Sequence, residues 1–231
     1  MTSVALNFLQ ARSEDRGYFL MVEGGRIDHA NHQAMAWRAL SETVAMDLAV
    51  EEILRQVELE DTLIIVTADH SHTLAISGWT GRTADITGIV KADSGWVMKA
   101  EDNEPLSILR YSLYCLVSTL YFSTPSYVNG PGFKKMKVRE NSTDTSWEAI
   151  ERAGDLKENQ RADPSFVFPG AVPLEKETHG GDDVGIFSTG PWSHLFHTVH
   201  EQTYIAHVMS FAACIGPHKY HGHPARCKKR G

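Results

Sequence analysis

The sequence is poor in cysteine and in positive charge, and this excludes several classes of protein. Its 231 residues include three cysteines, Cys115, Cys214 and Cys227, which are too few and too scattered for a disulfide scaffold or a cysteine-rich zinc module. Lys and Arg number 22 against 29 Asp and Glu, so the net charge is −7. Such a chain has no basic field to hold a phosphate backbone, and we expect no nucleic-acid partner.

Targeting signals and long hydrophobic runs are also missing from these residues. The beginning of the sequence lacks the basic start and apolar stretch of a signal peptide, and no hydrophobic tail of the lipid-anchor type follows the basic C-terminal residues. The longest uncharged stretch, Tyr111–Phe133, is soon interrupted by serine, proline and glycine, so it is too short to span a bilayer. The sequence by itself therefore predicts a soluble chain.

Apolar residues and histidines are what the sequence does contain. Hydrophobic residues make up 42% of it, which suffices for the core of one large domain or two small ones and excludes disordered and fibrous classes. Twelve histidines are many for this length and indicate metal chemistry.

Apolar spacing predicts an α/β fold. Helical spacing over Val4–Ala11 leads into the apolar run Tyr18–Val22, which we expect to be a buried strand. A long helical pattern follows over Ala30–Val57, and then a second strand over Thr62–Thr67. A strand–helix–strand unit predicts that the two strands are parallel.

The second half of the sequence begins with a region in which apolar residues lack regular spacing. Turn-forming residues and short segments extend from Gly81 to Pro173 with little helical period, which predicts an irregular excursion. Order returns with the glycine-bounded, strand-like stretch 179–190 and with a helix over about Glu201–Cys214.

Carboxylates and imidazoles recur where the predicted strands end. Glu23 ends the first strand, and Asp28 and His32 follow it at positions i and i+4, which share one face of a helix and can hold one ion. Asp69 and His70 follow the second strand. Parallel strands present their carboxyl ends at one edge, where ligands bind. His179, beside two glycines at the last strand, is a further expected ligand.

Each piece has an alternative explanation without a metal. Asp28 and His32 could cap a helix start and pair with each other, and Asp69 with His70 could be ordinary turn chemistry. The recurrence at successive strand ends favours a metal site. Carboxylate-plus-imidazole sets without thiolate suit Zn²⁺, whereas Glu23, a hard oxygen donor, suits Mg²⁺. Two close metals suit in-line displacement at phosphorus, which indicates phosphoryl chemistry.

Long sequence blocks resemble the metazoan alkaline phosphatases in the same order. The blocks are MVEGGRIDHANH, IIVTADHSHT, ETHGGDDVGIFSTGPWSHLFHTVHEQTYIAHVM and AACIG. The resemblance implies an α/β sandwich with a mostly parallel central sheet flanked by helices, here incomplete. It implies hydrolysis of phosphate monoesters through two zinc ions and one magnesium ion, by way of a phosphorylated serine.

The resemblance also implies roles for single residues. The residue matching Glu23 binds magnesium, those matching Asp28, His32 and His179 bind the first zinc, and those matching Asp69 and His70 bind the second. His29 and His72 match positions that are not primary ligands. The resemblance begins partway through the family's sequence, and no Asp-Ser-Ala nucleophile motif occurs in these residues. We therefore expect a chain that carries metal ligands but no catalytic nucleophile, and that is inactive in isolation.

Within the resemblance, the chain is one C-terminal part of a phosphatase domain. Its core is expected at about 1–75 and 178–231, and a crown-like insertion at about 76–177. That insertion resembles a region that shapes the active-site entrance and the dimer interface; the alternative is a solvated loop with no specific task. The segment Leu106–Tyr121 interrupts the family pattern. We interpret it as an unspliced intron or a gene-model error; the alternative is an insertion that touches a membrane or a partner.

The resemblance places the parent protein outside the cell. It implies a homodimer, a GPI anchor at the cell surface, and a disulfide between Cys214 and Cys227, for which two free thiols are the alternative. Asn141 begins a glycosylation sequon, which agrees with secretion. The main rival is a catalytically inactive zinc-binding module. Another two-metal enzyme, such as a phosphodiesterase or sulfatase, fits the ligand scheme but not the long sequence blocks.

Overall fold

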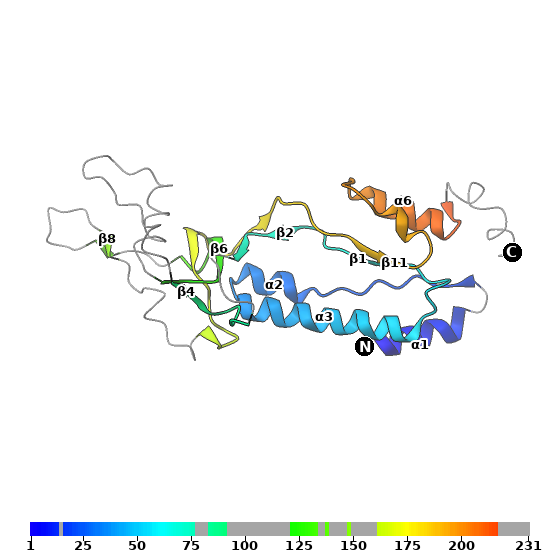
Figure 1. The fold of residues 1–231 in the computed structure, drawn as a ribbon, viewed down its shortest axis with the longest axis horizontal. Helices are drawn as coiled ribbons and strands as arrows, with labels where there is room; N and C mark the ends of the chain where they lie inside the picture. The colour runs from blue at the N-terminus through cyan, green and yellow to red at the C-terminus, as the bar shows by residue number, and fades with distance from the viewer. Residues whose placement is uncertain are drawn as a thin grey trace. The chain divides into compact units, whose positions relative to one another are not determined.

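The α/β class is confirmed by a computed structural model, in which helices come first along the described residues, short strands follow and helical segments come last (Figure 1). The structure describes residues 1–13, 16–76, 83–91, 121–133, 137–138, 147–148 and 161–216. The chain divides into two compact units, the first of Met1–Glu23, Ala45–Ser71 and Asp182–Gly231 and the second of Gly24–Val44 and His72–Gly181.

Two helices pair in the first unit. Helix α1 spans Thr2–Ser13, and helix α3 spans Ala36–Gln56 and contributes its C-terminal half to this unit. The amide of Gln56 donates to the Ser3 hydroxyl at 2.7 Å, and the amide of Gln10 donates to the Gln56 carbonyl at 3.1 Å. The helix predicted at the start of the sequence is therefore formed and is held by the end of α3.

The sheet of the first unit is a single antiparallel pair. Strand β1 (Ile64–Val66) pairs with β11 (Phe187–Thr189), with Ile65 opposite Ser188. The short helix η4 (Ser193–Leu195) and helix α6 (Thr203–Ala212) follow β11. The second predicted strand and the last predicted helix are confirmed.

The first predicted strand, by contrast, is wrong. Residues 18–22 pair with no strand in the part of the chain that the structure describes, and Phe19 and Met21 are 71% and 77% exposed. The predicted parallel pairing with 62–67 is wrong as well, since β1 pairs with β11. An apolar run shows that a segment is suited to burial, but a strand also needs a neighbour that completes its ladder of hydrogen bonds.

Short strands dominate the second unit. Strand β6 (Pro125–Gly130) is central, with β3 (Leu74–Ile76) antiparallel on one side and β9 (Gly170–Pro173) parallel on the other. The remaining pairs are β2 (Ser71–His72) with β10 (His179–Gly180), β4 (Ile89–Lys91) with β5 (Tyr121–Ser123), and β7 (Lys137–Val138) with β8 (Trp147–Glu148).

The long helix predicted over 30–57 is divided in two. Helix α2 spans Arg26–His32, and α3 begins at Ala36. Between them Ala34 adopts a left-handed φ of 53° and is fully buried. Its carbonyl accepts a hydrogen bond from the Phe168 backbone at 2.8 Å. The break is thus set by a contact with a distant segment, which local spacing cannot reveal.

The core of the second unit packs around this break. Phe168 and Tyr127 are 0% and 2% exposed and cluster with Ala34 and Ala36. The ring of Phe166 meets that of Phe168 edge to face, with centroids 4.8 Å apart. Ala34 and Ala36 come directly after α2 in the sequence, so the packing of this cluster and the position of α2 are linked.

Several predictions fall outside the described residues. These are the insertion Leu106–Tyr121 apart from its last residue, the thiols of Cys115 and Cys227, and the sequon at Asn141. The disulfide, the glycosylation, the single-domain division and the crown-like role of 76–177 stay predictions. Among the described helices, none combines the length and apolar character needed to cross a membrane.

Candidate metal centre

Helix α2 supplies an acid and an imidazole to one point in the second unit. Asp28 and His32 lie one turn apart, and Oδ1 of Asp28 is 3.2 Å from Nε2 of His32. The i, i+4 spacing therefore does what the sequence predicted and places both side chains on one face.

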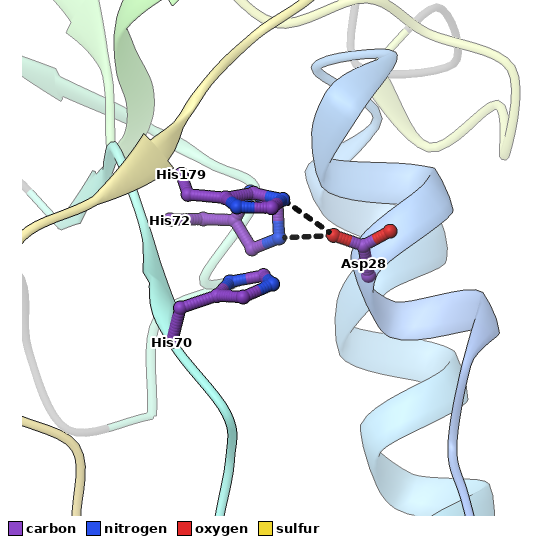
Figure 2. Close-up of side chains that lie close together, drawn as sticks. All are labelled: Asp28, His70, His72 and His179. Carbon is purple, nitrogen blue, oxygen red and sulfur yellow. Dashed lines mark hydrogen bonds and ion pairs between the residues drawn. The ribbon is translucent and has the colours of Figure 1, made fainter.

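Two further imidazoles reach the same carboxylate oxygen. Nε2 of His72 lies 3.0 Å from Oδ1 of Asp28, and Nε2 of His179 lies 3.3 Å from it (Figure 2). Nε2 of His179 is also 3.1 Å from Nε2 of His32. The rings of His32, His72 and His179 are mutually close, with centroids 4.9 to 5.2 Å apart. Three imidazole nitrogens therefore approach one carboxylate oxygen.

The hydrogen-bond partners of two of these rings determine which ring nitrogen carries the hydrogen. Nδ1 of His32 donates to the Glu177 carbonyl at 2.6 Å, and Nδ1 of His72 donates to a carboxylate oxygen of Glu177 at 2.7 Å. A carbonyl or a carboxylate can only accept, so Nδ1 carries the hydrogen in both rings. When neutral, each ring turns the electron pair of Nε2 toward Asp28.

This donor set fits zinc. Nε2 of neutral His32 carries an electron pair and lies 3.1 Å from Nε2 of His179, a separation that requires a proton or a cation between the two nitrogens. A tetrahedral zinc ion with bonds of 2.0 to 2.1 Å has ligand atoms about 3.3 Å apart. The separations between 3.0 and 3.3 Å around Asp28 are close to this value. Nitrogen and oxygen ligands without sulfur also match zinc chemistry.

Neighbouring groups keep Asp28 in its carboxylate form. Partial burial raises the pKa of Asp28, but the charge of His32, the hydrogen bond from His72 and the charges of His72 and His179 together bring it below its usual value. A ligand to a cation must be deprotonated, so this environment prepares Asp28 for metal binding.

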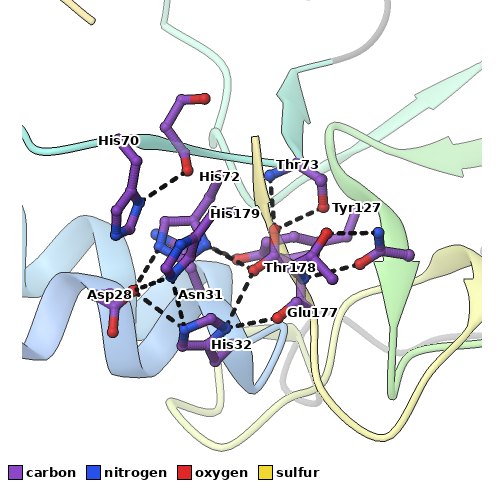
Figure 3. A network of polar contacts seen from close by, with 12 residues as sticks. Asp28, Asn31, His32, His70, His72, Thr73, Tyr127, Glu177, Thr178 and His179 are labelled. Atoms are coloured by element: carbon purple, nitrogen blue, oxygen red, sulfur yellow. Dashed lines mark hydrogen bonds and ion pairs between the residues drawn. The ribbon is translucent and has the colours of Figure 1, made fainter. Parts of the chain in front are cut away.

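A buried acid lies behind the imidazoles. The side chain of Glu177 is fully buried, and its other carboxylate oxygen accepts from the backbone and the hydroxyl of Thr73, each at 2.6 Å (Figure 3). The backbone of Glu177 also donates to the His32 carbonyl at 2.9 Å. Next to it, Thr178 exchanges two hydrogen bonds with the side chain of Asn129 on β6, which fixes the segment that carries His179.

The other three predicted ligands belong to the first unit. Glu23 is the last residue of its first segment, and Asp69 and His70 follow β1. Nε2 of His70 lies 3.4 Å from the Asp69 carboxylate, and Nδ1 of His70 donates to the Ser71 carbonyl at 3.1 Å. The structure thus gathers Asp28, His32 and His179 within one unit. The first zinc site, the second zinc site and the magnesium site all stay predictions.

A cavity of about 270 Å³ lies next to His32 on the side of α2. Its lining is rich in cations and imidazoles, and consists of Arg26, His29, Ala30, His32, Gln33, Arg38 and Lys176. This lining is suited to an anion, because basic side chains raise the local concentration of negatively charged molecules.

Tyr127 supports the helix that carries the ligands, and replacing it with phenylalanine is expected to cost about 1 to 3 kcal/mol. Its hydroxyl donates to Oδ1 of Asn31 at 2.8 Å, and both side chains are buried. Removal of the hydroxyl leaves the Asn31 oxygen without this donor. Urea unfolding at pH 8 measures the cost.

The same variant has a characteristic pH dependence. Burial raises the pKa of Tyr127, and the charge of Glu177 raises it further. Above about pH 10 an unfolded tyrosine loses its proton while folded Tyr127 keeps it, so the stability that Tyr127 contributes is complete below that pH and falls above it. The difference in stability between wild type and Tyr127→Phe should shrink above pH 10, and a constant difference would contradict this reasoning.

Sequence reasoning assigned nothing to Glu177, which is buried beside this centre. It placed His72 outside the primary ligands, and this stays a prediction, with Nε2 of His72 lying 3.0 Å from Oδ1 of Asp28. The available signal for Glu177 was its position two residues before His179, because extended backbone places residues i and i+2 on the same side. Burial of its carboxylate is a tertiary property that the sequence does not show.

The fold and the donor set define an α/β protein with a candidate zinc centre. The sequence profile of the alkaline phosphatase family matches residues 1–215, and the chain therefore belongs to the alkaline phosphatase family. It is 38% identical over 226 residues to the human tissue-nonspecific isozyme of alkaline phosphatase, covering 97% of this chain and 36% of that protein. Alkaline phosphatase 4 of Drosophila melanogaster is 36% identical over 219 residues, covering 95% and 33%.

A fish alkaline phosphatase is similar to this chain to about the same extent. The alkaline phosphatase of Gadus morhua is 37% identical over 220 residues, covering 95% of this chain and 38% of that protein. The chain thus spans about a third of the length of the curated relatives it matches.

Proposed function

We propose that this chain supplies the metal-binding part of an alkaline phosphatase that hydrolyses phosphate monoesters. The observation that carries the proposal is the convergence of Asp28, His32 and His179 on one point, in a chain that belongs to the alkaline phosphatase family. Zinc is the proposed metal there because the donors are imidazole nitrogens and a carboxylate oxygen at tetrahedral separations.

Asp69 and His70 are proposed to hold a second zinc ion, and Glu23 a magnesium ion. When bound, such ions act as Lewis acids that stabilise the negative charge developing on phosphoryl oxygens. The residues of this chain hold the ions in place, and Asp28 keeps its negative charge close to them. We expect the 231 residues to provide these ligands and not the serine nucleophile.

We propose that the cationic cavity attracts the substrate. Arg26, Arg38 and Lys176 line it beside His32, so a phosphate dianion would be drawn toward the metal centre. A site that recognises mainly the phosphoryl group leaves the rest of the substrate free to vary, and we expect a broad range of monoesters. A homodimer at the cell surface is the form in which we expect the protein to act.

Metal removal tests this function directly. The natural protein is expected to hydrolyse an aryl phosphate monoester at alkaline pH, to lose this activity on dialysis against a chelator, and to regain it when zinc and magnesium are added together. Zinc binding without hydrolysis under any of these conditions would favour the second candidate, a catalytically inactive zinc-binding protein. Hydrolysis that is equally fast after complete removal of zinc would refute the metal assignment.

A further inference from the structure

Glu177 is a buried carboxylate at the metal centre whose role is not explained by the ligand assignments. Its side chain is 0% exposed, and three donors meet its two oxygens. The donors are Nδ1 of His72 at 2.7 Å and the backbone and hydroxyl of Thr73, both at 2.6 Å. A carboxylate in the interior is costly even when it is hydrogen-bonded, so its presence calls for a specific task.

The main chain of Glu177 is held as firmly as its side chain. Its backbone and that of His32 are joined by one hydrogen bond at 2.9 Å, and Nδ1 of His32 adds a second to the Glu177 carbonyl at 2.6 Å. On the other side lies Gly130, with a φ of 123°, where an added Cβ would be only 3.0 Å from Cβ of Glu177. Glycine at 130 thus permits the close approach of β6 to Glu177.

The contacts of Glu177 favour an indirect role. Glu177, His32 and His72 could together hold an ion, because one potential ligand atom from each lies within 4.8 Å of the others. The oxygens of Glu177, however, are already engaged by Thr73 and His72, and they face the Nδ1 sides of the imidazoles. The Nε2 atoms, which face Asp28, are on the opposite side of each ring.

We propose that Glu177 is a positioning residue for the zinc centre. Its carbonyl fixes the ring of His32 and its carboxylate fixes the ring of His72, so that both Nε2 atoms are aimed at Oδ1 of Asp28 before the metal arrives. The inference rests on the proposed function in so far as it requires zinc at this point. Groups that orient metal-ligating histidines in this way commonly contribute about 10- to 100-fold to metal affinity.

The test is the replacement Glu177→Gln in the natural, full-length protein. Glutamine preserves the shape but cannot accept from both His72 and Thr73, since one of its two polar atoms is an NH₂ donor. We expect zinc affinity, measured by competition with a chromogenic chelator, to fall by about 10- to 100-fold. The visible absorption of the cobalt-substituted protein should also change, because the ligand geometry shifts.

The matched control is Glu175→Gln, the same chemical change at an exposed position two residues earlier on the same segment. It should leave zinc affinity and the cobalt spectrum at wild-type values. Glu177→Asp, which keeps the charge but draws the oxygens back, should give an intermediate loss of affinity. If Glu177→Gln fails to fold, the zinc affinity of Glu177→Asp is measured in its place.

The outcomes separate the inference from the proposed function. Wild-type zinc affinity and cobalt spectrum in folded Glu177→Gln, or in Glu177→Asp where the first variant does not fold, would overturn the positioning role. A complete loss of zinc from Glu177→Gln at saturating metal would overturn it too, since it would make Glu177 a ligand. A wild-type protein that binds zinc but hydrolyses no monoester would refute the proposed function, while the affinity comparison would still decide the role of Glu177.

Discussion

In the natural, full-length protein, replacing Asp28 with alanine is expected to remove zinc from the proposed centre and to lower the proposed phosphatase activity at least about a thousandfold. Oδ1 of Asp28 is the atom that Nε2 of His32, His72 and His179 all approach, at 3.0 to 3.3 Å. The carboxylate of Glu177, by contrast, faces the Nδ1 sides of His32 and His72. A lost metal costs several kcal/mol of transition-state stabilisation, which corresponds to three or more powers of ten in rate.

Zinc stoichiometry and initial rates together measure the effect of Asp28→Ala. Asp47→Ala is the matched control, because Asp47 is an exposed helical aspartate on α3 outside the centre, and both quantities should stay at wild-type values. Asp28→Asn keeps a neutral oxygen and should retain more zinc than the alanine variant. Full zinc content with unchanged rate in Asp28→Ala would rule out this carboxylate as a ligand.

The elements that sequence could predict are those set by local spacing. Apolar residues at helical spacing were enough for α1 and α6, and an apolar run bounded by polar residues was enough for β1. Asp28 and His32 were predictable in the same way, since their separation of four residues places them together on any helix.

The elements that sequence missed depend on contacts between distant segments. The partner of β1 is β11, more than a hundred residues away, and the helix break at Ala34 is held by a hydrogen bond from Phe168. Glu177 illustrates the same limit at the site. An acidic residue in a polar stretch is expected at the surface. Glu177 is buried only because it packs against His32 and β6.

The other large expected effect is a loss of stability when the buried side chain of Phe168 is removed. Phe168→Ala should destabilise the protein by about 3 to 5 kcal/mol, because Phe168 is fully buried and its removal leaves a cavity lined by Tyr127 and Ala34. Urea unfolding of the metal-free protein measures this, and Phe168→Leu, which refills most of the volume, should cost clearly less. A loss below about 1 kcal/mol for the alanine variant would show that the site collapses without strain or is not part of the core.

The same substitution distinguishes packing from positioning at the centre. Ala34 lies two residues after His32 and is held by the Phe168 backbone, so a cavity at Phe168 should loosen the end of α2 and weaken zinc binding through a general loss of order. Saturating zinc should then recover much of the stability, since a ligand that binds only the folded state stabilises it. Glu177→Gln acts directly on the rings of His32 and His72. For each variant, the loss of zinc affinity can be divided by the loss of stability of the metal-free protein. This ratio should be larger for Glu177→Gln than for Phe168→Ala. Equal ratios in the two variants would mean that Glu177 matters only for packing.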